Sequence, residues 1–291
     1  MALEKIWGHW KKNSFRFTVL LWVLLTLSVT LGVKGLLESE LENEILQTIA
    51  DRIEARTKGQ SEEAKIDSAI QLCYFLQERR TLVLSPHTFK SFKATAFRSS
   101  LQSFYIGVGA CGYYSLFAAR VLQKMGYHPK IVQQRVNHRW GAHITLAIPL
   151  KTSSAMIVVD PLYRHVFRNA QGELCSLQDL RKHWTYHSQT LPANYNPAYN
   201  YQQGWRHTNW DKYGFISRAA YQIFCWTMGQ EKADLISARM WIIDPYRVQS
   251  VVSFLFGGYI IGLLILGGVL RWKDRGRVEE NSHGNMHHNE G

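Results

Sequence analysis

The 291-residue sequence predicts an α+β domain flanked by two transmembrane helices. Three observations predict this fold class. A helical pattern begins at Cys111, two strand-like segments lie between residues 142 and 160, and one uncharged apolar run lies near each end of the chain. A helix followed by antiparallel strands favours a domain in which the helix packs on one face of the sheet.

The first element is the helix that begins at Cys111. Apolar residues after it recur at nearly helical spacing, and Gly126 is a natural stop, so about four turns are expected. Cys111 then lies in the first turn, where unpaired backbone N–H groups and the helix dipole favour the nucleophilic thiolate. A buried cysteine that acts as a small apolar side chain is the usual alternative. His143 and Asp160 downstream favour the nucleophile.

Residues 142–148 and 155–160 are predicted strands, joined by a hairpin loop at 149–154. A hairpin symmetric about Lys151 and Thr152 places His143 directly opposite Asp160, with the two Cβ atoms roughly 5 Å apart. A slip of one residue would send the two side chains to opposite faces of the sheet.

These three residue types in this order suit nucleophilic catalysis. Cys111 is the predicted nucleophile and His143 the base that accepts its proton. Asp160 is predicted to orient the imidazole and support its charged form.

Two other histidines compete with His143 for the role of base. His138 would face Asp160 only if the turn were centred on Pro149, which breaks the strand pattern, so we place His138 in a loop. His165 is expected at the surface.

The remaining cysteines have structural interpretations. Cys73 and Cys225 lie in apolar helical patterns that predict core packing, and Cys175 is predicted in a turn before a short helix that begins near Ser176. An oxidising compartment would permit one disulfide among these three, whereas an active Cys111 has to stay free. No Cys or His cluster has metal-site spacing and no glycine-rich phosphate loop is present, so neither a metal nor a cofactor is expected.

The residues around Cys111, His143 and Asp160 resemble the core of the transglutaminase-like superfamily of papain-like cysteine enzymes, in a bacterial membrane-anchored form. The resemblance covers about residues 60–185 and is carried by residues 111–115, 122–132, 141–143 and 158–161. It implies a papain-like core with a catalytic triad of Cys111, His143 and Asp160. It also implies a cysteine protease, amidase or acyltransferase that works through an acyl-enzyme.

Two positions depart from the family pattern. Many relatives have an acidic residue four positions after the histidine, where this chain has Ala147. The side-chain donor of the oxyanion hole stays open among Gln102, Ser103 and Tyr105. The alternative function is therefore a catalytically inactive domain that binds a peptide or glycan partner at the membrane surface.

The uncharged runs are residues 17–33 and 248–270, and both are long enough to span a bilayer. A signal peptide is the alternative for the first run, but no small-residue cleavage site follows it, so we favour an uncleaved anchor. The predicted segments are a cytoplasmic N-terminus, a first transmembrane helix, an extracytoplasmic transglutaminase-like domain, a second transmembrane helix and a cytoplasmic tail, at residues 1–16, 17–35, 36–249, 250–270 and 271–291.

Charge predicts the orientation of these spans. Four Lys or Arg residues precede the first run, four more follow the second within residues 271–277, and four glutamates follow the first run within residues 38–44. The positive-inside rule then places both termini in the cytoplasm. The expected location is a bacterial inner membrane, crossed twice, with the catalytic domain in the periplasm.

The partners follow from that location. Residues 36–249 contain 25 Lys and Arg against 17 Asp and Glu, a net charge of about +8 that would attract anionic lipids or polymers, and nucleic acid is a poor partner outside the cytoplasm. A peptide or protein is the expected substrate, with membrane lipid around the spans and a membrane protein or cell-envelope polymer as a further possible partner. Residues 186–215, dense in Tyr, Asn and Trp, are interpreted as a substrate rim, a membrane-interface belt or a loop packed over the core.

Overall fold

The computed structural model describes residues 14–79, 99–106, 111–153, 155–241 and 243–286. Most of the predicted N-terminal segment, the end of the C-terminal tail and the four residues before Cys111 lie outside the described residues. The chain divides into two compact units, residues 1–39 with 246–291, and residues 40–245. The predicted boundaries at residues 36 and 249 lie within four residues of this division.

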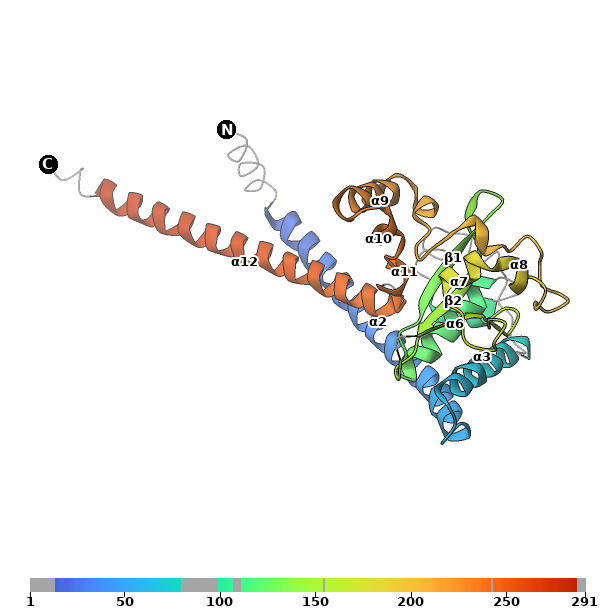
Figure 1. Cartoon of the computed structure of the whole chain (residues 1–291). Coiled ribbons are helices and arrows are strands. Elements are labelled where there is room, and N and C mark those ends of the chain that lie inside the picture. The colour runs from blue at the N-terminus through green and yellow to red at the C-terminus, as the bar shows by residue number, and fades with distance from the viewer. Residues whose placement is uncertain (1–13, 80–98, 107–110, 154, 242, 287–291) are drawn as a thin grey trace. The chain divides into compact units, whose positions relative to one another are not determined.

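The first unit contains the beginning of α2 (Ser14–Arg56) and most of α12 (Pro245–Met286), the two long helices of Figure 1. Both helices are long and apolar enough to cross a membrane. Within this unit small residues bring the two helices close together, because the Ser250 hydroxyl donates a hydrogen bond to the Gly32 carbonyl at 2.8 Å. A Cβ atom at Gly32 would lie only 2.8 Å from the Phe254 ring.

The second unit is α+β, as predicted, and is built on a five-stranded antiparallel sheet with the strand order β4-β3-β2-β1-β5. The central hairpin of β1 and β2 is visible in Figure 1. The strands are β1 (Lys130–Val136), β2 (Arg139–Pro149), β3 (Met156–Asp160), β4 (His165–Val166) and β5 (Trp205–Arg206).

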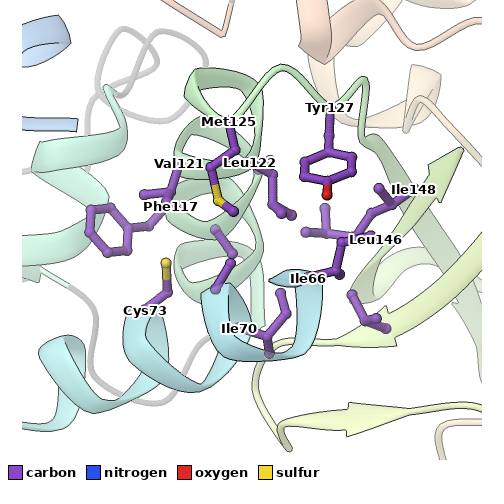
Figure 2. Close-up of a cluster of buried hydrophobic side chains, with 14 of the residues drawn as sticks. Ile66, Ile70, Cys73, Phe117, Val121, Leu122, Met125, Tyr127, Leu146 and Ile148 are labelled. Atoms are coloured by element: carbon purple, nitrogen blue, oxygen red, sulfur yellow. The ribbon is translucent and has the colours of Figure 1, made fainter. Parts of the chain in front are cut away.

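Helices cover one face of this sheet. α3 (Glu62–Glu78) and α6 (Cys111–Lys124) bury apolar side chains against each other and against strand residues such as Leu146 and Ile148, and Figure 2 shows this cluster. Leu46, Ala50 and Ile53 of α2 complete the cluster. The predicted helix therefore begins at Cys111 as expected. It ends before Gly126, whose positive φ of 78° suits glycine.

Aromatic and short helical segments cover the opposite face. Val132, Ala147 and Val158 point from the strands into a second buried cluster with α7 (Leu177–Lys182), α8 (Trp184–His187) and η2 (Tyr201–Gln203). The predicted short helix is α7, and Ser176 caps its N-terminus in a capping box with Asp179. Two hydrophobic layers thus hold the sheet from both sides.

The register of the β2–β3 hairpin differs from the predicted one by two residues. Leu146 pairs with Val159, so His143 is not directly opposite Asp160. The turn is displaced because the backbone N–H groups of Lys151 and Thr152 donate to the carboxylate of Glu62 on α3, at 2.6 and 3.1 Å. Side-chain direction repeats every two residues, so this slip leaves His143 and Asp160 on the same face.

The last part of the second unit contains η3 (Trp210–Tyr213), α9 (Gly214–Met228), α10 (Gln230–Asp234) and α11 (Ala238–Trp241). None of the residues of α9 is buried, and Phe215 and Trp226 are 84% and 88% exposed. The prediction that Cys225 packs in the core is therefore wrong, because α9 lies at the surface and Cys225 is half-buried there. Cys73, in contrast, is buried in the core as predicted.

Candidate functional site

Cys111 is the first residue of α6 and is half-buried. The first backbone N–H groups of a helix have no partner within the helix, so this position favours a thiolate. Two contacts hold this end of α6 against β2. The Ser115 hydroxyl donates to the Ile144 carbonyl at 2.9 Å, and a Cβ atom at Gly112 would lie 3.1 Å from the Ile144 side chain. The nucleophile candidate is thereby fixed beside the strand that carries His143.

His143 and Asp160 form a buried ion pair. The imidazole Nε2 and the Asp160 Oδ2 are 2.6 Å apart, and both side chains are fully buried. Asp160 Oδ1 accepts a second hydrogen bond, from the backbone N–H of Leu162 at 3.1 Å. The described β2–β3 pairs stop at Leu146 and Val159, so His143 extends beyond them and reaches Asp160 diagonally rather than across a pair.

The electrostatics of this pair favour the imidazolium. Burial acts to lower the pKa of His143, but the charge and hydrogen bond of Asp160, together with Cys111, outweigh burial and raise the pKa to about 9. Nε2 is taken by Asp160, which leaves Nδ1 for Cys111. Nδ1 is buried and makes no hydrogen bond to the described residues, and Cys111 acts on the ring by raising the pKa of the imidazole.

Three tyrosines enclose the imidazole. The Tyr199 ring stacks on it, with centroids 3.8 Å apart and an interplanar angle of 9°. Tyr163 and Tyr195 lie with their ring centroids 6.2 Å from that of the histidine. Part of the aromatic stretch 186–215 therefore packs over the core around His143. The sequence offered no specific signal for Tyr163, whose ring is brought to the site by the turn after Asp160.

A cavity of about 400 Å³ opens beside Cys111. It lies between α6, the strands β1 and β2, and the segment around η3 and α11. Its lining includes Ser103, Cys111, Gln133, Asn209, Lys212 and Arg239. The last four of these were missed by sequence reasoning, because no local motif marks them.

The strand wall of this cavity contains an irregularity at Gly141. β1 and β2 change register between Gln134 and Arg135, and Gly141 has a positive φ of 70°. A Cβ atom there would lie 2.5 Å from the Asn209 amide nitrogen and 2.7 Å from the Gln133 amide oxygen. Glycine is needed both for the backbone conformation and for the approach of these two amide groups.

Neither of the competing histidines lines the cavity beside Cys111. His138 is exposed at the tip of the β1–β2 turn, with a positive φ of 62°, so the loop prediction holds. His165 is half-buried on β4, where it pairs with Asp160 in the ladder, and burial lowers its pKa. The predicted surface position of His165 is therefore wrong, because β4 closes the edge of the sheet there.

A second cysteine–histidine contact lies away from the cavity. The sulfur of Cys175 is 3.8 Å from Nε2 of His187, and both residues are buried. Burial raises the pKa of Cys175 to about 11, which favours the inert thiol. The described cysteines are all free, and none of the three disulfide candidates is paired.

The proposed donors of an oxyanion hole do not all reach the cavity. Of Gln102, Ser103 and Tyr105, all on α5 (Ser100–Ile106), Ser103 lines it. The Ser103 hydroxyl, however, donates to the Ser99 carbonyl at 2.9 Å. The Gln102 side-chain oxygen accepts from the Ser99 N–H at 3.2 Å. The backbone N–H of Cys111 remains the candidate donor at the helix start.

Among the described residues, no group of three His, Cys, Asp or Glu side chains is placed to hold a metal ion. Comparison of the chain with protein-family models, curated proteins and solved structures finds no match. The function of the chain is therefore inferred from Cys111, His143 and Asp160 themselves.

Proposed function

We propose that this chain is a membrane-anchored thiol enzyme that cleaves or transfers amide bonds through a Cys111–His143–Asp160 triad. The observation that carries the proposal is the fully buried His143–Asp160 pair beside a half-buried cysteine at a helix start. The resemblance to the transglutaminase-like superfamily adds the expectation of a papain-like core. The helix packed on an antiparallel sheet is compatible with that expectation.

The proposed reaction uses the proton that His143 holds. With a pKa of about 9, the imidazole is protonated at neutral pH, and its charge favours the Cys111 thiolate. The sulfur attacks the amide carbonyl carbon, the C–N bond breaks, and the leaving nitrogen takes the proton from His143. A thioester remains on Cys111. Water then attacks it, gives a proton to His143 and releases a carboxylic acid, or an amine attacks and releases a new amide.

Asp160 and the three tyrosines act through the histidine in this scheme. Asp160 fixes the ring and supports its positive charge. Tyr199 stacks on the ring, and Tyr163 and Tyr195 add to its enclosure. A fixed imidazole keeps Nδ1 directed at the nucleophile between the two half-reactions.

The proposed location is the periplasmic side of a bacterial inner membrane. The two apolar helices supply the anchors. The Lys and Arg residues that precede the first apolar run and follow the second support cytoplasmic termini. The substrate in this scheme is an extracytoplasmic peptide or protein.

A non-catalytic binding domain is the second candidate function. It is favoured because, of the three predicted oxyanion donors, Ser103 alone lines the cavity, and its hydroxyl donates to the Ser99 carbonyl. Such a domain would bind a peptide or glycan in the same cavity without turnover.

The rate of Cys111 alkylation against pH separates these candidates. The full chain in detergent, with Cys225→Ser to remove the other half-buried thiol, is treated with iodoacetamide and read by peptide mass spectrometry. Triad chemistry predicts rapid alkylation well below the ordinary thiol pKa of about 8.5, lost in His143→Ala. An ordinary thiol profile in both proteins would overturn the enzyme proposal and favour the binding domain. Cys111→Ala is the control for the assignment of the labelled peptide.

A further inference from the structure

The surface helix α9 presents an apolar face to solvent. The side chains of Phe215, Ile216, Ile223 and Trp226 are 84%, 82%, 59% and 88% exposed. With about 100° between successive residues of a helix, these four side chains fall within about one third of its circumference. We call them the outer face of α9. A contiguous apolar surface of this kind on a folded domain is typical of an interaction site.

The opposite side of α9 holds the helix on the domain. The ring of Tyr221 stacks on that of Trp210, with centroids 5.9 Å apart, and the ring of Phe224 lies 5.6 Å from the same indole. The Tyr221 hydroxyl donates a hydrogen bond to Asp234 of α10 at 2.9 Å. These contacts fix the rotation of α9 about its axis, so the outer face is directed away from the domain.

The chain that follows α9 leads directly to a candidate membrane helix. Asp234, the partner of Tyr221, comes eleven residues before Pro245, where α12 begins. An extended chain of that length spans at most about 40 Å. Exposed apolar side chains continue along this connection, since Leu235 and Trp241 are 49% and 67% exposed. Tryptophan is enriched where a membrane helix meets the headgroup region.

The composition of α9 suits a bilayer surface. Its sequence contains no Asp or Glu, and Arg218 is its only charged residue. A carboxylate would be repelled by anionic headgroups, whereas an arginine is attracted to them. Aromatic and branched apolar side chains on one face, with a basic residue beside them, are typical of helices that lie in the plane of the membrane interface.

We infer that α9 is an interfacial helix whose outer face inserts into the headgroup region of the bilayer that holds α2 and α12. The inference rests on the proposed membrane anchoring and is independent of the thiol chemistry. Anchoring makes the bilayer a permanent neighbour of the domain at high effective concentration, whereas a second copy of the chain has to be met by diffusion. Lipid is therefore the occupant that this face fits best.

Insertion of α9 has a consequence for the cavity beside Cys111. Asn209 and Lys212 line this cavity and precede α9 by a few residues, and Trp210 between them packs on the inner side of the helix. An inserted α9 would hold this wall of the cavity near the membrane surface. The proposed substrate would then be a peptide or protein presented at that surface.

Quenching by spin-labelled lipid tests the contact. The full chain with Cys111→Ser and Cys225→Ser is reconstituted into vesicles of phosphatidylcholine and phosphatidylglycerol, and the fluorophore NBD is attached at Ile223→Cys. The label is compared with one at Lys182→Cys, on the exposed surface of α7, and one at Ile261→Cys, within the second apolar run. Some of the phosphatidylcholine carries a nitroxide near the headgroup end or near the methyl end of one acyl chain.

The nitroxide near the headgroup end should lower the fluorescence of the Ile223→Cys label about two-fold and leave the Lys182→Cys label unchanged, because an interfacial helix lies at that depth. The nitroxide near the methyl end should act mainly on the Ile261→Cys label. Phe215→Ser together with Trp226→Ser should abolish the quenching at Ile223→Cys. Phe75→Ser, which removes a 46% exposed aromatic side chain of α3, should preserve it.

The other outcomes overturn the inference in distinguishable ways. Quenching at Ile261→Cys without quenching at Ile223→Cys would show that the domain is anchored but α9 does not touch lipid. A blue-shifted but unquenched Ile223→Cys label would assign the outer face to a protein contact, such as a second copy. No quenching at either position would refute the anchoring as well. Failure of the triad in the alkylation experiment would leave the lipid quenching unchanged, because the labelled protein already lacks Cys111.

Discussion

At the scale of single residues, two opposing effects act on the pKa of His143. Burial disfavours its charge, yet Asp160 at 2.6 Å reverses the balance and raises its pKa to about 9, above the ordinary 6.5. A pKa raised by folding means that the protonated form contributes stability. This contribution is complete below about pH 6.5 and is lost as the pH rises through about 9.

Replacing Asp160 by asparagine tests this account of the imidazole. Asp160→Asn removes the negative charge but keeps the size of the side chain, so burial then dominates and the pKa of His143 falls below its ordinary value. NMR titration of the imidazole measures the shift. The decline in stability between about pH 6.5 and 9, followed by thermal unfolding, should disappear together with it.

Asp179→Asn provides the matched control, because Asp179 caps α7 and has no contact with His143. That variant should leave the imidazole titration unchanged. An unaltered titration in Asp160→Asn as well would show that the ion pair does not govern the protonation of His143.

At the scale of elements, the position of α6 on β2 determines whether Cys111 lies close enough to His143 to react with it. The two residues come from different layers, since α6 covers one face of the sheet and His143 belongs to the face that carries Thr145 and Ala147. The hydrogen bond from Ser115 to Ile144 spans this boundary one turn after Cys111. Helix position is therefore set by a polar contact in addition to apolar packing.

Ser115→Ala should weaken the attachment of α6 to β2. We expect a loss of about 1 kcal/mol in the free energy of unfolding, because one buried hydrogen bond is removed. We also expect slower alkylation of Cys111 at low pH, because the sulfur shifts relative to the imidazole. Denaturant titration and the iodoacetamide profile measure the two effects.

Ser188→Ala is the comparison for Ser115→Ala, because its exposed hydroxyl makes only a local hydrogen bond to Thr185. Equal alkylation profiles in the two variants would show that Ser115 has no positioning role.

At the scale of the whole molecule, an ion pair joins the two ends of the unit formed by residues 40–245. Arg120 on α6 lies 3.2 Å from Asp244 and donates to the Asn43 side-chain oxygen at 2.8 Å. Asn43 and Asp244 lie near the first and last residues of the unit, and the pair is nearly buried. The helix that carries Cys111 is thus connected to both segments that enter and leave the domain.

Arg120→Met should destabilise this unit by about 3 kcal/mol, because the nearly buried carboxylate of Asp244 loses the positive charge of Arg120. Chemical denaturation of the full chain, followed through the tryptophans, measures the loss. Arg181→Met on the exposed surface of α7 removes the same charge with little expected effect. Equal midpoints for both variants would contradict a structural role for the Arg120 pair.

Local chemistry explains which elements were predictable. The helix start at Cys111, the stop at Gly126 and the cap at Ser176 depend on residues within one or two turns of each other, and the structure confirms all three. The strands 142–148 and 155–160 were found from alternation and apolar runs, and lie inside β2 or overlap β3.

The features that were missed depend on partners distant in the chain. Glu62 binds the hairpin loop from 89 residues away and displaces the register by two. The exposed position of Cys225 follows from the placement of α9, since an apolar helix pattern describes a surface helix as well as a core helix.

Residue order and periodicity alone therefore identify the α+β class, the two apolar helices and the three candidate residues, because each depends on short-range backbone preferences and hydrophobic patterning. The placement of the imidazole against Asp160 and Tyr199, and the set of residues that line the cavity beside Cys111, arise when segments more than fifteen residues apart pack together. Burial and charge act through space, so the raised pKa of His143 exists only after the chain has folded.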